Sequence, residues 1–209
     1  MKPLTKSLLK KIEHDPEQVD WEDITKHYEL SEAFIIQHQD RIDWHYVSYR
    51  QILSEAFIER YEDKIAWGYI WAHQQLSEQF IIQHQDRILW TTVSLYQELS
   101  EPFIERYKDK VDWVYISSFQ ALSNSFIAKY QDRVDWKSIC IHQRLSEAFI
   151  TKHQDRVDWK LISQFQKLSE GFILKHLIRL NLDTIKDRYH EVYVKYRLDL
   201  YQTLMLSTS

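Results

Sequence analysis

Hydrophobic residues recur along this chain with a fixed period of 23 residues. Each period opens with a Leu-Ser pair and has Phe four residues after the Leu. Six of the seven periods also have Trp fourteen residues after the Leu. The Leu-Ser pairs begin at residues 30, 53, 76, 99, 122, 145 and 168, with no insertion between them. A constant period of this length is typical of stacked supersecondary units, so the pattern predicts a tandem-repeat array.

Within one period, the apolar residues follow the spacing of two short helices. In the unit 30–52 the stripe of the first helix consists of Leu30, Phe34, Ile35 and His38. The stripe of the second helix consists of Trp44, Val47, Ser48 and Gln51. Ser31 and Asp43 precede these helices, and their side-chain oxygens can accept hydrogen bonds from backbone N–H groups of the first turn. The spacing therefore predicts two capped helices in each unit.

Helices of this length are marginal in water unless each buries its apolar stripe against a neighbour. Stacking of seven units with identical offsets meets this need. It predicts an all-α fold, an α-solenoid of tandem 23-residue two-helix repeats with N- and C-terminal caps. We expect an N-terminal cap with a degenerate repeat at 1–29 and a C-terminal cap at 183–209. The repeats between them are expected at 30–52, 53–75, 76–98, 99–121, 122–144, 145–167 and, as a partial unit, 168–182.

Both ends depart from the repeat pattern in the way that capping units do. Residues 19–24 match the Trp helix, and an earlier helix is expected to carry Leu4, Leu8, Leu9 and Ile12. In the last unit, Leu182 replaces the Trp. Beyond it, one face of a longer helix is formed by Tyr189, Val192, Tyr193, Tyr196 and Leu200. The same segment alternates in hydrophobicity, which leaves a strand as the alternative, although no other segment is predicted as a strand to pair with it. With a cap at each end, we expect the chain to be complete.

Composition agrees with a helical protein and excludes several other classes. The 209 residues include two Gly, three Pro and one Cys. So few Gly and Pro disfavour β-sandwiches, collagens and Gly-rich phosphate loops. One Cys excludes intrachain disulfides and zinc sites built on several thiolates. No segment has the apolar length of a signal-peptide core or a membrane span, so we expect a cytoplasmic protein without membrane attachment.

The repeated motif reads Leu-Ser-Glu-x-Phe-Ile, then Asp-Arg-Val-Asp-Trp, then Ile-Ser and Gln, and it is most complete at 145–167 and 30–52. It resembles tandem-repeat proteins encoded by large DNA phages and giant viruses, over residues 30–182. The resemblance implies a viral or mobile-element source and no particular target. For a viral source, our hypothesis is a factor in the host-cell interior that binds or inhibits a host protein such as a defence protein. It implies no catalytic activity. Three departures, Ala66, Trp71 and Cys140, leave the repeat's other apolar positions unchanged.

Histidines suggest chemistry first, but their placement argues against it. One repeat position holds His38, His84, His153 and His176, and Tyr elsewhere. A metal ligand would not alternate with Tyr, and metal binding needs several convergent ligands, so we predict no metal site and no cofactor. The His-Gln-Asp-Arg sequence that follows from three of these residues is copied along the array, whereas catalysis needs one constellation in one pocket. We therefore expect half-buried, hydrogen-bonded histidines and no catalytic residues.

The Trp and Gln positions also have a structural interpretation and a functional one. A row of Trp rings can stack nucleobases. The Trp nevertheless lies on the apolar stripe of the second helix, beside a small Ser, and such pairs are typical of interdigitating layers. We therefore favour core packing for Trp. The invariant Gln is expected to satisfy buried backbone groups between repeats.

Variable positions on the second helices are the candidate binding residues. They are His45, Tyr46, Tyr49, Tyr69, Tyr115, Lys137 and Lys160. Tyr is a favoured residue at protein interfaces, so these positions predict a surface for a protein partner. The alternative is that the tyrosines pack between adjacent repeats.

Charge is distributed unevenly. The formal net charge is −8 for residues 1–121 and +4 for residues 122–209. Three columns of cations recur in the second part: Lys129, Lys152 and Lys175; Arg133, Arg156 and Arg179; and Lys137 with Lys160. Such columns predict a basic stripe that can meet phosphates or an acidic protein, or else a solvated, ion-paired face. The opposite charges of the two parts also permit head-to-tail self-association.

Taken together, these features favour a non-enzymatic protein-binding repeat scaffold whose partner the sequence does not identify. The alternative is binding of single-stranded RNA or DNA along the basic C-terminal half. The net charge of −4 and the expected burial of Trp disfavour this alternative.

Overall fold

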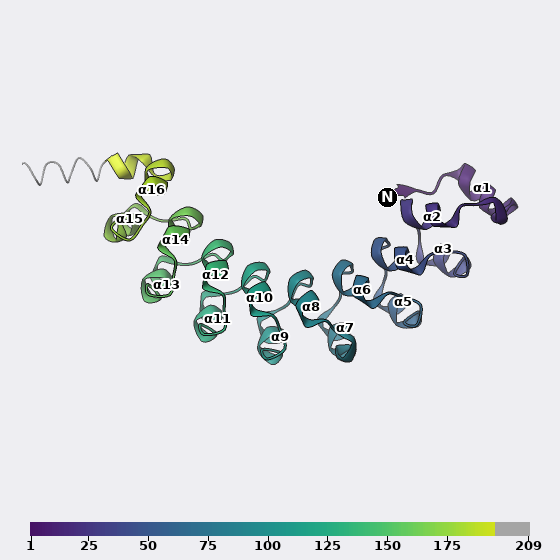
Figure 1. Ribbon diagram of the computed structural model, residues 1–209, viewed down its shortest axis with the longest axis horizontal. Coiled ribbons are helices and arrows are strands. Elements are labelled where there is room, and N and C mark those ends of the chain that lie inside the picture. The colour runs from purple at the N-terminus through teal and green to yellow at the C-terminus, as the bar shows by residue number, and fades with distance from the viewer. Residues whose placement is uncertain (195–209) are drawn as a thin grey trace, which may run out of the picture. The chain divides into compact units, whose positions relative to one another are not determined.

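In the computed structural model of the protein, which describes residues 1–194, each repeat folds into two short helices (Figure 1). The predicted all-α repeat solenoid is therefore confirmed. Contacts divide the chain into two compact units, Met1–Leu99 and Ser100–Ser209. We call them unit 1 and unit 2 and describe each by itself.

The helices keep the 23-residue period of the sequence. The first helices in unit 1 are α3 (Glu32–Gln37), α5 (Glu55–Arg60) and α7 (Glu78–Gln83). Their second helices are α4 (Trp44–Arg50), α6 (Trp67–His73) and α8 (Trp90–Tyr96). The first helices in unit 2 are α9 (Glu101–Arg106), α11 (Asn124–Lys129), α13 (Glu147–Lys152) and α15 (Glu170–His176). Their second helices are α10 (Trp113–Phe119), α12 (Trp136–His142), α14 (Trp159–Phe165) and α16 (Leu182–Arg188).

Side-chain caps start these helices at the predicted positions. Ser31 Oγ accepts a hydrogen bond from the backbone N–H of Phe34 at 3.2 Å. The Ser at the equivalent position caps each of the remaining first helices. Asp43 Oδ1 accepts from the N–H of His45 at 2.8 Å, and α10, α12 and α14 also begin after a capping Asp. Helices α6 and α8 begin after Ala66 and Leu89, which provide no side-chain cap.

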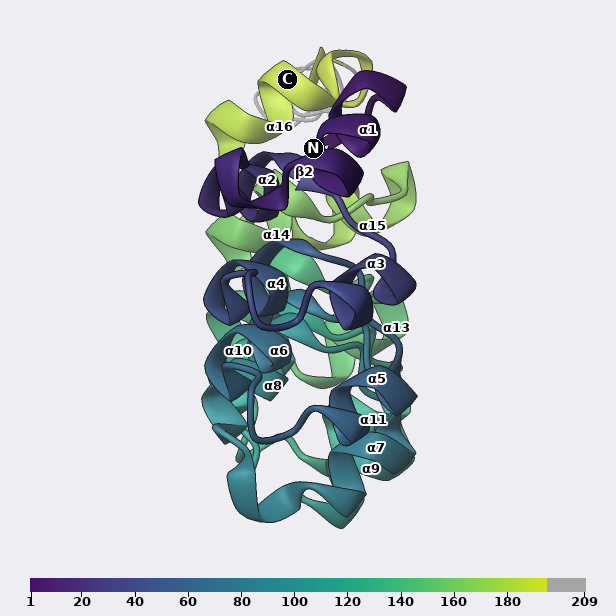
Figure 2. The same cartoon turned by 90° about the vertical axis from the view of Figure 1, so that its right-hand side faces the viewer.

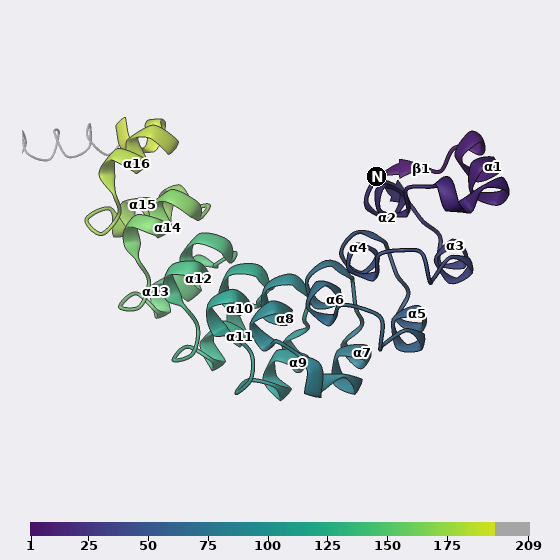
Figure 3. The same ribbon diagram turned by 45° about the vertical axis from the view of Figure 1, so that its right-hand side comes forward.

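Within each unit, the first helices form one row and the second helices form another (Figures 2 and 3). Inside a unit, the second helices of successive repeats pack directly on one another. Each first helix buries one Ile completely, as Ile58 and Ile127 do, and each second helix buries a β-branched residue in the same way, as Ile70 and Ile139 do. The core is thus a continuous apolar layer between the two rows of a unit.

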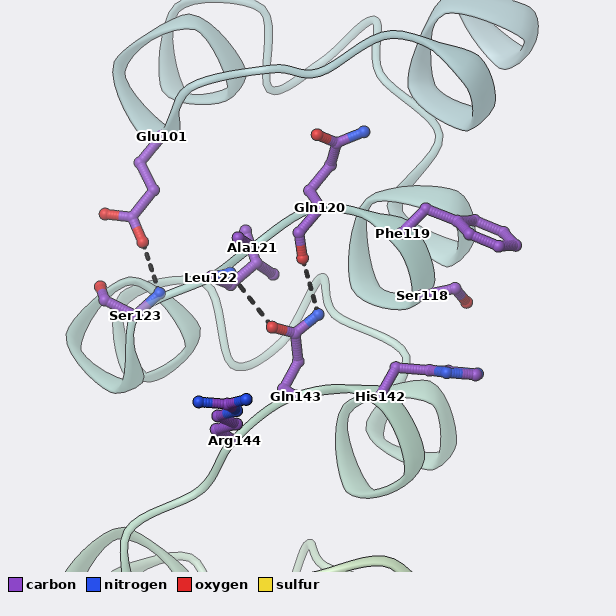
Figure 4. A pocket seen from close by; sticks show the side chains of 10 residues that line it. All are labelled: Glu101, Ser118, Phe119, Gln120, Ala121, Leu122, Ser123, His142, Gln143 and Arg144. Carbon is purple, nitrogen blue, oxygen red and sulfur yellow. Dashed lines mark hydrogen bonds between the residues drawn. The ribbon is translucent and has the colours of Figure 1, made fainter.

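Within each unit, a Gln side chain links a repeat to the preceding one (Figure 4). Gln143 Oε1 accepts from the N–H of Leu122 at 3.1 Å, and its Nε2 donates to the carbonyls of Gln120 and Ser117 at 2.8 and 2.9 Å. The same three bonds recur at Gln51, Gln74, Gln97 and Gln166. The prediction for this Gln is confirmed, and we call the set the glutamine ladder.

A second set of bonds between repeats was not expected. Glu32, in the first turn of α3, accepts a hydrogen bond from the backbone N–H of Ser54 in the next repeat at 2.6 Å. Glu101 and Glu147 bind the following Ser in the same way, and Asn124 replaces the Glu in the fifth repeat. In these pairs, a repeat therefore completes the cap of its successor.

The N-terminal cap contains the two expected helices, α1 (Lys6–His14) and α2 (Trp21–His27), separated by the 3-10 turn η1 (Pro16–Gln18). Ile12 and Ile24 are buried, whereas Leu9 is exposed. Two very short strands, β1 (Lys2–Pro3) and β2 (Tyr28–Glu29), pair in parallel. The expectation that the chain contains no second strand candidate was wrong here, because this pairing depends on where α2 places Tyr28 and not on local alternation.

The C-terminal cap continues the repeat register. Helix α16 begins after Asn181, whose side chain caps it as Asp does elsewhere. Tyr189 occupies the position of the ladder Gln, accepting from the N–H of Leu168 at 3.1 Å and donating to the carbonyl of Gln166 at 3.3 Å. Residues 190–194 are helical, as preferred over a strand. Tyr196 and Leu200, the remaining positions of that prediction, lie outside the described residues.

Candidate interaction surface

The candidate binding residues lie on the side of the second helices that faces away from the core. Tyr49 and Tyr69 are 39% and 42% exposed. The side chains of His45, Lys137 and Lys160 are also exposed, whereas Tyr46 and Tyr115 are half-buried. We call this side of each unit its second-helix face.

In unit 1, four rings gather on this face. The ring centroids of Tyr49 and Tyr69 are 5.2 Å apart, and that of His73 lies 4.7 Å from Tyr49 in an edge-on arrangement. Tyr96 lies 6.5 Å from His73 and is 53% exposed. We call these four residues the tyrosine–histidine cluster. Three of them, Tyr69, His73 and Tyr96, border an open hollow of about 460 Å³ on α6 and α8. Tyr69 is thus exposed, as a surface for a partner requires. Its ring also contacts the ring of Tyr49 in the preceding repeat, as the alternative of packing between repeats predicts.

The sequence analysis missed one position of this surface. The residue directly before the ladder Gln is His73, Tyr96, Phe119, His142 and Phe165 in five successive repeats. Its side chain stays accessible, with Phe119 59% and Phe165 45% exposed. The signal was present as an aromatic or His residue repeated at this position, but without the helix geometry it looked like part of the apolar stripe.

In unit 2, the corresponding rings form a looser row. The ring centroid of Phe119 lies 6.3 Å from that of Tyr115 and 6.4 Å from that of His142. The rings of Phe119 and His142 are nearly parallel, at 22°. Figure 4 shows the side chains of Phe119 and His142 projecting to the same side of the second helices. A hollow of about 600 Å³ lies beside them, lined also by Arg144.

Charge separates the two rows of helices. The six second helices α4, α6, α8, α10, α12 and α14 contain no Asp or Glu, although the chain has 31 acidic residues. Every first helix except α11 contains at least one Glu. The second-helix faces are therefore aromatic and neutral to basic, whereas carboxylates are concentrated on the first helices and the turns.

Two residues of the Arg column of the predicted basic stripe, Arg133 and Arg156, are ion-paired between repeats. Arg133 Nη2 lies 2.6 Å from Asp109, and Arg156 Nη2 lies 2.6 Å from Asp132. Lys129 pairs with Glu105, which lowers the pKa of that carboxyl and raises the pKa of the Lys ammonium. These three cations already have anionic partners, as the alternative of an ion-paired face predicts.

Tryptophan lies between repeats and is half-buried. The indole N–H of Trp136 donates to the carbonyl of Gln131 at 2.9 Å, and the same bond to the residue five positions earlier recurs at Trp44 and Trp159. The Trp136 ring stacks on Phe149 of the next repeat at 6.1 Å. This is the packing role that we favoured, although the rings lie at the edge of the core.

The histidine column is packed as expected, but its expected hydrogen bond is wrong for three of the four residues. Within the described residues, the Nε2 atoms of His84, His153 and His176 are buried and have no hydrogen-bond partner. His153 instead lies between the rings of Phe149, 4.4 Å away, and Trp136. Burial lowers the pKa of His153 and of His176, and the adjacent Lys and Arg lower each further.

No chemical site emerges elsewhere in the described part of the chain. Among residues 1–194, no three His, Cys, Asp or Glu side chains converge so as to hold a metal ion. Cys140 is buried, and burial raises the pKa of its thiol to about 11. Such a thiol is almost entirely protonated at neutral pH and is therefore a poor nucleophile.

The chain matches no protein-family model, no curated protein and no solved structure. Over residues 1–194, no helix has both the length and the apolar character needed to cross a membrane.

Proposed function

We propose that the protein is a non-enzymatic scaffold that binds a partner protein through its second-helix faces. The observation that supports this is the tyrosine–histidine cluster, in which Tyr69 and Tyr96 remain 42% and 53% exposed beside an open hollow. Tyr contributes large amphipathic contact area with few rotatable bonds, and hot spots of protein interfaces are enriched in it.

The backbone beneath this surface is held in place before any partner arrives. In unit 1, Gln74 and Gln97 of the glutamine ladder each donate to two backbone carbonyls of the preceding repeat and accept from one backbone N–H of their own repeat. A surface fixed in this way loses little conformational entropy on binding, so more of the contact energy appears as affinity.

The partner that we propose is a host protein, and the cytoplasm is the place where the two meet. The resemblance of the repeats to those of phage and giant-virus proteins supports the first part. The single, buried Cys140 is compatible with a reducing compartment, which supports the second.

Site-specific photo-crosslinking tests this function. The photoreactive residue p-benzoylphenylalanine is placed at Tyr69 and, as a matched control, at Gln79, an exposed position on the first helix α7. Cells of the relevant host are then irradiated. We expect a discrete crosslinked protein from position 69 and none from position 79, because only the former lies on the second-helix face.

A paired substitution then measures the contribution of the cluster. With the crosslinked protein purified, Tyr69→Ala with Tyr96→Ala should weaken its binding at least tenfold. Ile178→Ala, which removes an exposed apolar side chain from a turn, should not weaken it. Absence of a crosslink at Tyr69, or equal crosslinking at Gln79, would refute the assignment of this face.

A further inference from the structure

We propose that the second-helix face of α12 and α14 in unit 2 binds a polypeptide segment that carries an apolar stripe flanked by Asp or Glu. This inference rests on the proposed function, and it adds the chemistry of the partner. Its basis is a pair of cationic rims on either side of an apolar strip that contains no carboxylate.

The rims are formed by four cations at equivalent repeat positions. Lys137 and Lys160 are the second residues of α12 and α14, and Arg144 and Lys167 follow the last residues of these helices by two positions. All four residues are exposed. A seven-residue helix is about 10 Å long, so the two rims flank a strip of about that width.

These cations have no anionic partner of their own. In the described part of the chain, their side chains make no ion pair or hydrogen bond, in contrast to Arg133 and Arg156. The nearest helix caps, Asp135 and Asp158, accept backbone N–H groups at 2.8–3.1 Å. The four rim cations therefore remain available to pair with the carboxylates of an acidic partner.

Between the rims, no accessible side chain is acidic, and apolar and aromatic side chains lie beside the exposed Gln164. Ile141 and Leu161 are half-buried, and Phe165 is 45% exposed. Ile141 and Phe165 line a hollow of about 520 Å³ together with His142, Arg144 and Lys167. Apolar contact and charge pairing are thus available to a single segment lying along this strip.

A polypeptide fits these rims better than a nucleic acid does. Nucleic-acid binding draws its affinity from many simultaneous phosphate contacts, often six to ten. Only four cations without an ion-pair partner frame this strip in the described part of the chain, because Arg133 and Arg156 are paired with Asp109 and Asp132. The apolar strip between the rims would remain uncovered by a sugar–phosphate backbone.

The rims are a feature of these two repeats and not of the repeat type. The positions equivalent to Lys137 hold His45, Gly68, Thr91 and Val114 in the preceding repeats. The positions equivalent to Arg144 hold Ile52, Gln75, Glu98 and Ala121. Since helix packing does not need a cation at either position, the charges at α12 and α14 call for an explanation beyond folding.

Selection of ligands from a random-sequence peptide display library, with the full-length protein as bait, tests the inference. We expect the selected peptides to be enriched in Asp and Glu next to large apolar residues. Binding of the selected peptides should weaken at least tenfold with Lys137→Glu plus Lys160→Glu, and also with Arg144→Glu plus Lys167→Glu. Lys152→Glu plus Lys175→Glu is the matched control, because it makes the same charge change on the first helices and should leave binding unchanged.

Each other outcome contradicts the inference. Peptides without acidic enrichment, equal weakening by the control, or no selected peptide at all would each refute it. So would tighter binding of the single-stranded oligonucleotide dT20 than of the peptides. Circular dichroism of every variant establishes that a loss of binding is not a loss of folding. The crosslink at Tyr69 tests the proposed function separately, so a failure here leaves that result standing.

Discussion

Within each unit, a single Gln side chain makes three hydrogen bonds to the backbone where two repeats meet. These bonds fix the register of one repeat on the next. In unit 2, Gln143 is 7% exposed and its three partners are backbone groups. Since buried backbone groups must be paired, the invariance of this position across repeats has a physical cause.

Replacing this Gln should therefore destabilise the protein more than its size suggests. Gln143→Leu leaves one buried N–H and two buried carbonyls without their partner, and each costs about 1–3 kcal/mol. We expect the free energy of unfolding to fall by about 3 kcal/mol or more in urea titrations. Gln164→Leu, at an exposed position, is the control and should change it by less than about 0.5 kcal/mol. Equal effects of the two substitutions would contradict the ladder.

The histidine column makes stability depend on pH. The pKa values of His38, His153 and His176 are lowered in the folded protein by burial first, and then by nearby cations. The unfolded chain, with ordinary His pKa values of about 6.5, then binds more protons. Stability is therefore unaffected well above pH 6.5 and is lost as pH falls from about 6.5 through the lowered folded values.

Thermal melting at pH 7.5 and pH 5 measures this effect. The wild type should lose more stability between these two values than a triple variant with His38→Tyr, His153→Tyr and His176→Tyr. Tyr occupies the same position in other repeats, as Tyr130 does, so the variant retains a residue that fits there. His45→Tyr, at an exposed position, is the control. An unchanged pH dependence in the triple variant would exclude the column as its source.

At the scale of elements, most helix starts could be predicted because each depends on a local signal. A Ser or Asp accepts from backbone N–H groups two or three residues later, so the signal and the structure lie within one turn. The β1–β2 pair could not be predicted, because Lys2 and Tyr28 meet only after α1 and α2 have packed. The hydrogen bond that Glu32 accepts from the N–H of Ser54 in the next repeat was missed for the same reason.

The two uncapped helices provide a test of this local rule. Leu89 stands at the N-cap of α8, is 59% exposed and makes no side-chain cap bond. Leu89→Asp restores the residue that caps α4 and α10, and should raise the free energy of unfolding by about 1 kcal/mol. Leu89→Ala removes the same apolar surface without adding an acceptor and should give no gain. A melting temperature that rises equally in both variants would attribute the gain to lost apolar surface.

At the scale of the whole molecule, the fold was predictable and the candidate surface only partly so. The period of 23 residues alone indicates a solenoid, because identical offsets require identical neighbours. Tyr49 and Tyr69 could be placed on the surface from helical spacing. Phe119 and Phe165 could not, since an aromatic residue beside an apolar stripe reads as core until the geometry of the helix end is known. The absence of carboxylates from six second helices becomes visible only when the helix bounds are known.

Interchangeable repeats make one further prediction about the array. Deleting residues 122–144 joins Ala121 to Leu145, so that Gln166 meets the backbone of Gln120 in place of Gln143. Because neighbouring interfaces use the same residues, this shortened chain should fold with unchanged ellipticity per residue at 222 nm and a lower melting temperature. Deleting residues 122–132 instead removes half a period. This deletion removes Leu122 and shifts Gln143 out of register with the carbonyls of Ser117 and Gln120. That chain should lose its cooperative melting transition. If both shortened chains melted alike, the register of the glutamine ladder would be excluded as the feature that holds the repeats together.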